Sequence, residues 1–152
     1  MSDNREAARE AVAALTAAGH RRIGFVWGPP VPEQPTTRRA LLAASARDLW
    51  TDSERLRGYL DALDDAGILF DPQLVMVGPK TENRATHEVD RMLSLTDRAT
   101  AFFCTETDAM TGALRTLRAK RLSYPGDVSL IGFDDSAWAG RPSPPPPASW
   151  VP

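Results

Sequence analysis

The chain has 152 residues, of which 42% are hydrophobic and 25% are charged, and its formal net charge is −2. This length and composition are typical of one folded domain, or of one lobe of a larger one. The pI near 5.7 excludes the basic footprint that nucleic-acid-binding domains carry. A single cysteine, Cys104, excludes an intrachain disulfide.

Helix and strand signals alternate from the start of the chain. Asp3 and Glu6 have the spacing of a capping box and open a predicted helix over residues 3–18. The apolar run at 23–27 predicts a strand. The long stretch 29–50 begins rich in proline and then acquires a helix-forming composition, so we interpret it as an irregular or partly helical insertion.

The alternation continues to residue 134. We predict helices that begin near residues 51, 83 and 107, and strands at 74–77, 101–104 and 128–132. Thr105 or Thr107 is expected to cap the last of these helices. Strands that alternate with helices indicate an α/β fold, a parallel sheet with helices on both faces. We assign residues 1–140 to this α/β unit and 141–152, which are rich in proline, to a disordered tail.

Polar residues that follow the strands are the candidate binding residues. The carboxyl ends of parallel strands meet at one edge of the sheet, where ligands of open α/β folds bind. The candidates at this edge are Thr51, Arg55, Lys80, Thr107 and Asp134. Asp134 directly follows an apolar strand, where a carboxylate needs a partner. An arginine and a carboxylate that face each other suit a polyhydroxylated ligand, because both bind vicinal hydroxyls.

Each candidate also has a purely structural interpretation. Arg55 could be an ion-paired helix residue, and Thr107 could be a helix cap. His20 lies in a tight helix-to-strand connection, where a surface or packing role is favoured over that of a catalytic base. The motifs of P-loops, hydrolase elbows and dinucleotide-binding loops are absent from the sequence, so we expect no enzyme, no cofactor and no metal site.

Several segments resemble the effector-binding core of the lactose/galactose-repressor family of bacterial transcriptional regulators. These segments are Gly19–Val26, Glu54–Tyr59, Thr107–Leu114 and Pro125–Asp135, and with their neighbours they cover most of residues 3–140 in the order of the family. The resemblance implies a periplasmic-binding-protein-like fold of two flavodoxin-like α/β lobes, with the effector between them. This chain resembles the carboxyl-side lobe, which implies the strand order 2-1-3-4.

The resemblance also implies roles for single residues. Arg55 and Asp134 correspond to effector-contacting residues of the family. Lys80 stands where relatives often carry an aromatic residue, and Thr107 replaces a usual asparagine. Arg121 stands where a glycine usually ends the helix.

The favoured interpretation is an incomplete, cytoplasmic, effector-sensing lobe of a transcriptional regulator that responds to a sugar or a similar polar metabolite. DNA would be contacted only through an amino-terminal domain that is missing from this sequence, and the lobe could form a homodimer. No apolar run is long enough to span a membrane. Two alternatives remain: a fragment of a sugar-binding transport protein of the same fold, and a stand-alone flavodoxin-like module. With half of the cleft missing, we expect weak or no effector binding by this chain alone.

Overall fold

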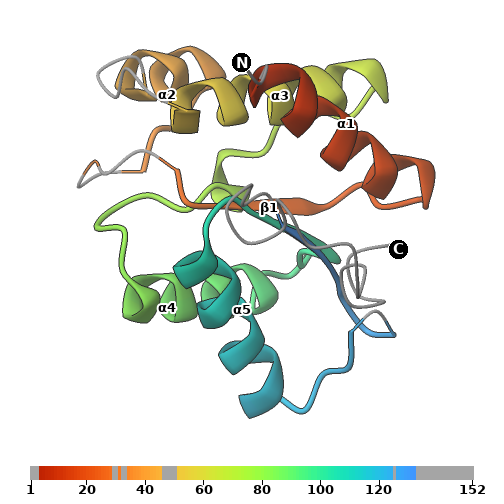
Figure 1. Ribbon diagram of the computed structural model, residues 1–152, viewed down its shortest axis with the longest axis vertical. Helices are drawn as coiled ribbons and strands as arrows, with labels where there is room; N and C mark the ends of the chain where they lie inside the picture. The colour runs from red at the N-terminus through yellow and green to blue at the C-terminus, as the bar shows by residue number, and fades with distance from the viewer. Residues whose placement is uncertain (1–3, 29–30, 32–33, 46–50, 125, 133–152) are drawn as a thin grey trace, which may run out of the picture.

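The computed structural model describes residues 4–28, 31, 34–45, 51–124 and 126–132, without the side chains of Thr51 and Asp52. In chain order its elements are α1 (Asn4–Ala17), β1 (Ile23–Val26), α2 (Arg38–Ser45), α3 (Thr51–Asp65), the short 3₁₀ helix η1 (Pro72–Leu74), α4 (Glu82–Leu93), β2 (Ala101–Cys104), α5 (Thr107–Ala119) and β3 (Ser129–Gly132). Figure 1 shows α1, α2 and α3 on one face of the sheet and α4 and α5 on the other. The predicted α/β class, with helices on both faces, is confirmed.

The described sheet has three parallel strands in the order β1-β2-β3. Phe25 of β1 pairs with Phe103 of β2, and Phe103 pairs in turn with Ile131 of β3. Every residue of β1 and β2 is buried, as expected for parallel strands that are covered on both faces. In Figure 1 the strands run from right to left, towards the side on which α3 and α5 begin.

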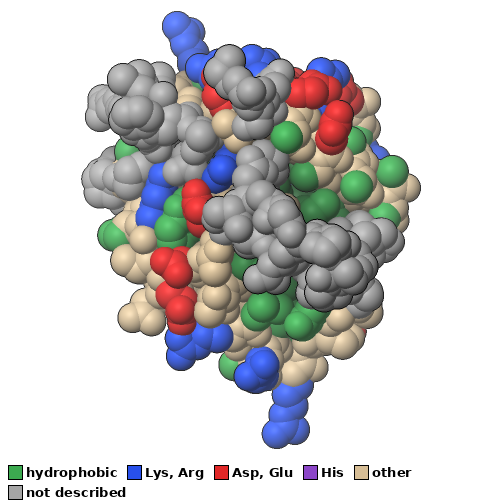
Figure 2. Space-filling view, viewed as in Figure 1, with side chains coloured by type: hydrophobic (Ala, Val, Ile, Leu, Met, Phe, Trp, Pro, Cys, Tyr) green, Lys and Arg blue, Asp and Glu red, His purple; other side chains and the backbone are tan. Residues whose placement is uncertain are grey.

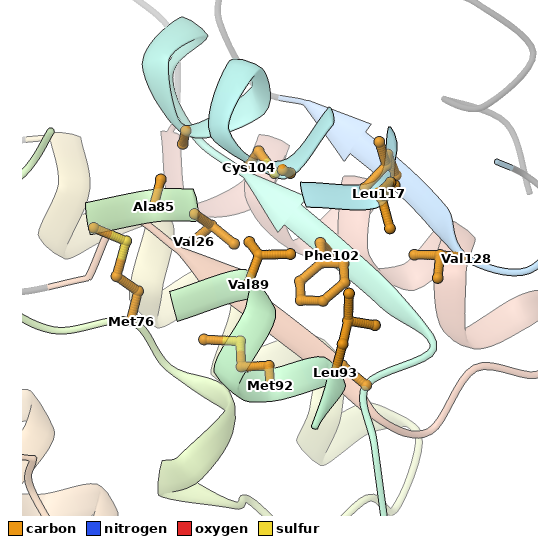
Figure 3. Close-up of a cluster of buried hydrophobic side chains, with 14 of the residues drawn as sticks. Val26, Met76, Ala85, Val89, Met92, Leu93, Phe102, Cys104, Leu117 and Val128 are labelled. Atoms are coloured by element: carbon orange, nitrogen blue, oxygen red, sulfur yellow. The ribbon is translucent and has the colours of Figure 1, made fainter. Parts of the chain in front are cut away.

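Each face of the sheet has its own apolar core, because successive side chains of a strand point to opposite faces. The core beneath α1 and α3 contains the aromatic residues Phe25, Tyr59 and Phe103. The core beneath α4 and α5 is built around Phe102, which lies among Val89, Leu93 and other aliphatic side chains (Figure 3). The sheet is therefore anchored on both sides by interdigitated side chains.

The strand predicted at 74–77 is not formed, and this part of the predicted four-stranded order is wrong for the described residues. Pro72–Leu74 is a 3₁₀ turn that the Asp71 side chain caps, and the sheet contact is reduced to one parallel bridge between Val75 and Phe25. The bridge lies on the side of β1 away from β2, the side expected for the missing strand. Gln34 donates from Nε2 to the carbonyl oxygens of Pro72 and Val75. These side-chain hydrogen bonds take the place of the backbone hydrogen bonds that a neighbouring strand would donate.

The predicted helix starts near 83 and 107 agree with the structure to within one residue, and only the expected cap of α5 is corrected. Helix α4 begins at Glu82 with Thr81 as its cap, which accepts from the Arg84 amide. Helix α5 is preceded by Glu106, rather than Thr105, at the cap position. Thr105 is fully buried, and its hydroxyl donates to the carbonyl oxygen of Val26 at the end of β1.

The remaining expectations concern the insertion and the end of α5. Helix α2 (Arg38–Ser45) accounts for the helix-forming part of the 29–50 stretch. Arg121, expected to replace a helix-ending glycine, has a φ of 57°. This left-handed conformation follows the last turn of α5, where glycine is the usual residue. The predicted disordered tail, 141–152, lies outside the described residues.

Candidate effector-binding site

Arg55 projects from the first turns of α3 towards the carboxyl end of β2. Its side chain is only 9% exposed. One guanidinium nitrogen, Nη1, donates to the carbonyl oxygen of Thr105 at 3.0 Å and to the carboxylate of Glu106 at 3.0 Å. Both acceptors lie directly after β2, so the predicted placement of Arg55 at the strand edge is what the structure shows.

Thr105 connects this arginine to the neighbouring strand. Its amide donates to the carbonyl oxygen of Val26 at 3.3 Å, and its hydroxyl donates to the same oxygen at 3.5 Å. Val26 is the last residue of β1. The guanidinium of Arg55 is therefore held in one place by the joined ends of β1 and β2.

Glu106 and Thr107 lie at the amino end of α5, next to Arg55. Glu106 occupies the cap position, but its side chain makes no capping hydrogen bond to the helix and instead pairs with Arg55 at 3.0 Å. Its side chain is 41% exposed, so the carboxylate remains accessible to solvent. Thr107 is the exposed first residue of the helix, and its hydroxyl group therefore lies at the same edge.

Lys80 follows a loop that helix α4 holds in place. Arg84 donates from Nε to the Val77 carbonyl oxygen at 3.1 Å, and Glu88 accepts from the Val77 amide at 3.4 Å. Glu88 is 2% exposed, and Arg91 neutralises its charge at 2.9 Å. Lys80 is partly buried, three residues beyond this anchored point. The sequence analysis missed Glu88, because its position next to Val89 in a helix does not predict burial of the carboxylate.

Two of the predicted site residues cannot be placed from the described structure. Thr51 is the first residue of α3, so its backbone is at the predicted edge, but its side chain lies outside the described residues. Asp134 also lies outside them; the described part of β3 ends at Gly132. The roles of Thr51 and Asp134 remain predictions.

His20 lies at the opposite edge of the sheet. One ring nitrogen, Nδ1, is 2.9 Å from the hydroxyl of Thr100, and the other, Nε2, is 2.9 Å from the hydroxyl of Ser129. These residues stand at the amino ends of β2 and β3, and partial burial lowers the pKa of the imidazole. The ring links two strands and is remote from the carboxyl edge, so it serves packing.

A strongly charged groove of about 340 Å³ lies between α1 and α3. Its arginines pair with carboxylates: Arg5 with Asp61 at 2.7 Å and Arg9 with Asp65 at 2.6 Å. These pairs join two surface helices, and the groove is not at the strand ends. We interpret it as a helix–helix contact.

The carboxyl edge offers a ligand both positively and negatively charged groups, which can also form hydrogen bonds. Figure 2 shows acidic and basic side chains close together on the left of the molecule, the side on which the strands end. Arg55 presents a guanidinium, Glu106 a carboxylate and Thr107 a hydroxyl. Among the described residues there is no group of three or more side chains that could hold a metal ion, and no described helix is long and apolar enough to cross a membrane.

Comparison with known proteins identifies the family to which the chain belongs. Residues 12–149 match the family model of the periplasmic binding protein-like domain. A protein of Rhizobium rhizogenes described as "Probable opine utilization operon repressor" is 37% identical over 143 residues, which are 94% of this chain and 67% of the relative. The chain belongs to the LacI family of transcriptional regulators.

Solved structures of LacI-family regulators agree with this membership. A sugar-binding LacI-family regulator of Escherichia coli, solved with phosphate, is 31% identical with a TM-score of 0.68, over 90% of this chain and 43% of that one. The regulator CelR, solved with cellobiose, is 32% identical with a TM-score of 0.70, over 90% of this chain and 37% of that one. This chain therefore spans less than half the length of these two regulators, and it corresponds to one lobe of their effector-binding domains. These relatives are regulators and not enzymes, in agreement with the predicted lack of catalysis.

Proposed function

We propose that the carboxyl edge of the sheet is one wall of an effector site, and that the effector is a sugar or a similar small polar metabolite. The observation that carries the proposal is the buried guanidinium of Arg55, held at the joined ends of β1 and β2. Ligands of open α/β sheets bind at this edge, and a charged donor that is fixed before binding loses little freedom when the ligand arrives.

The other predicted residues complete this wall. Thr107 supplies a hydroxyl that both donates and accepts, and Lys80 supplies an ammonium group from the loop anchored by α4. Thr51 and Asp134 belong to the same wall in the proposal, as the resemblance to the family implies. The second wall belongs to another lobe, as in the two-lobed effector domains of the family.

In the complete regulator, the effector would bias the relative orientation of the two lobes and so change the affinity for DNA. This proposal is supported by the relatives, which are named as operon repressors and transcriptional regulators. We place the protein in the cytoplasm, where such regulators act. DNA would be contacted through a separate domain, and a homodimer is part of the same proposal.

Isothermal titration calorimetry of the 152-residue chain with cellobiose and ribose tests this function. One wall of a cleft should bind weakly, in the millimolar range, or about −4 kcal/mol. Arg55→Lys keeps the charge but loses the planar fork of donors, so it should weaken binding by roughly ten-fold or more. The matched control is Arg9→Lys, which changes an arginine on the α1–α3 surface and should leave the affinity unchanged.

Two results would count against this proposal. Equal affinities of the wild-type chain and Arg55→Lys would remove Arg55 from the site. Micromolar affinity of the isolated chain would show that a second lobe is not needed. Thermal unfolding of each variant should accompany the titrations, so that a loss of binding is not mistaken for a loss of folding.

A further inference from the structure

We propose that Glu106 determines specificity at this edge: it admits neutral or amine-bearing polyhydroxylated ligands and discriminates against anionic ones. This inference rests on the proposed function, because it concerns the ligand class of the same site. Its basis is the ion pair between Glu106 and Arg55, in which the two charged groups are 3.0 Å apart.

The position of Glu106 is unusual for a glutamate. Cap positions favour short side chains, which accept a hydrogen bond from the first turn of the helix. Glu106 stands at the cap of α5 without making such a bond, and its carboxylate turns to the guanidinium of Arg55. The Glu106 side chain therefore pairs with Arg55, 51 residues away in the sequence, instead of with the first turn of its own helix.

The pair changes what the arginine can attract. An arginine alone would draw carboxylates and phosphates, with which it makes strong paired hydrogen bonds. With Glu106 beside it, the positive charge of Arg55 is offset by a carboxylate, and an arriving anion meets that carboxylate within a few ångströms. A hydroxyl faces no such repulsion, since it can donate to Glu106 while it accepts from the guanidinium, and an amine can donate to the more exposed Glu106.

The exposed fractions of the two side chains support a role for Glu106 in selecting the ligand that Arg55 binds. Arg55 is 9% exposed, whereas Glu106 is 41% exposed. A ligand that approaches from solvent therefore meets the carboxylate before the guanidinium. Helix α5 does not need Glu106 for capping, so the charge can be removed with little change in the fold.

NMR titration of the intact 152-residue chain with inorganic phosphate tests the inference, read from the side-chain Nε–Hε signal of Arg55. Arg55→Lys assigns the signal by removing it. In the wild-type chain, phosphate should shift it little. In Glu106→Gln, which keeps the shape but loses the charge, phosphate should bind about ten-fold more tightly or better. Glu106→Asp, which keeps the charge, should behave more like the wild type than Glu106→Gln does.

The matched control is Asp65→Asn, which removes the carboxylate of the Arg9–Asp65 pair on α3 and should leave the response of Arg55 unchanged. An equal response of the wild-type chain and Glu106→Gln would overturn the inference. The sugar titrations separate the two proposals. If phosphate binds Glu106→Gln more tightly than the wild-type chain but neither sugar binds, the specificity role of Glu106 stands and the sugar-effector function fails. If a sugar binds but phosphate affects the wild-type chain and Glu106→Gln equally, only the specificity role of Glu106 fails.

Discussion

Arg55 illustrates how one buried charge can be accommodated at a functional edge. Burial of a guanidinium is unfavourable unless hydrogen bonds and an opposite charge compensate for the lost water. The carbonyl oxygen of Thr105 and the carboxylate of Glu106 supply both. The sequence pointed to Arg55 as a polar residue that follows a strand, but its pairing with Glu106 could not be predicted from local spacing.

His20 shows how a polar residue can join two strands without taking part in binding. Its ring nitrogens contact the hydroxyls of Thr100 and Ser129, and Ser129 is buried. A neutral ring satisfies these contacts, because one nitrogen donates and the other accepts. The protonated ring has two donors and is disfavoured by burial.

This arrangement predicts a dependence of stability on pH. Because the pKa of His20 is lowered in the folded chain, the unfolded chain takes up the proton first, at about pH 6.5. Above about pH 6.5, His20 should therefore have no effect on the pH dependence of the free energy of unfolding. Below it, the free energy of unfolding should fall as the pH drops towards the lowered pKa of His20. The loss should be only a few tenths of a kcal/mol, since His20 is partly exposed.

Urea unfolding at pH 7.5, 6.0 and 5.0 measures the effect. His20→Gln should flatten the dependence over this range, whereas His87→Gln, which changes an exposed histidine on α4, should retain it. Identical pH profiles of the wild-type chain and His20→Gln would show that the ring does not couple to folding.

At the scale of the elements, the contact between α1 and α3 depends on a glycine within a helix. A Cβ atom at Gly58 would lie 2.2 Å from the carbonyl oxygen of Arg5 and 2.7 Å from the Cβ of Ala8. The two helices therefore cross backbone to backbone at this point. The bidentate pairs Arg5–Asp61 and Arg9–Asp65 flank the crossing.

This close crossing predicts the sign of a substitution. In an exposed helix, Gly→Ala stabilises by about 1 kcal/mol through helix propensity. Gly58→Ala should instead lower the free energy of unfolding by roughly 1–3 kcal/mol, because the added methyl group forces α1 and α3 apart. Glu54→Ala, at an exposed position of the same helix, should change stability by less than about 0.5 kcal/mol. Chemical denaturation of both variants checks this, and a stabilised Gly58→Ala would contradict the close contact.

The segment at 72–77 shows where local pattern fails as a guide. Four consecutive apolar residues predicted a strand, but only Val75 forms a bridge. Side chains also hold this segment: Gln34 donates to the carbonyl oxygen of Val75, and Arg91 donates to the carbonyl oxygen of Gln73 at 2.9 Å. Each of these bonds spans a long sequence separation or crosses elements, and apolar periodicity does not report it.

At the scale of the whole molecule, the fold followed from periodicity because it is set by burial on the two faces of the sheet. Apolar runs predicted β1, β2 and β3, and spaced apolar residues predicted most of the helices. The contacts at the two edges of the sheet were harder to predict, because they join residues that are distant in the sequence. His20 and Ser129 are 109 residues apart, and Arg55 and Glu106 are 51 apart. The family resemblance supplied Arg55, but not the glutamate beside it.

The carboxyl and amino edges of the sheet differ in the side chains that they carry. The carboxyl edge carries Arg55, Glu106 and Thr107, with side chains that can bind a polar ligand. The amino edge carries His20 between two hydroxyls, a closed arrangement that joins strands. If the lobe binds an effector, binding should be confined to the first edge.

Mapping amide shifts of the 15N-labelled chain during titration with cellobiose is the most direct test of this claim. We predict perturbed amides at 53–56, 78, 80 and 105–108, around the ends of the strands, and unperturbed amides at His20, Thr100 and Ser129. Shifts centred on the amino edge, or on the charged groove between α1 and α3, would contradict an effector site at the carboxyl ends of the strands.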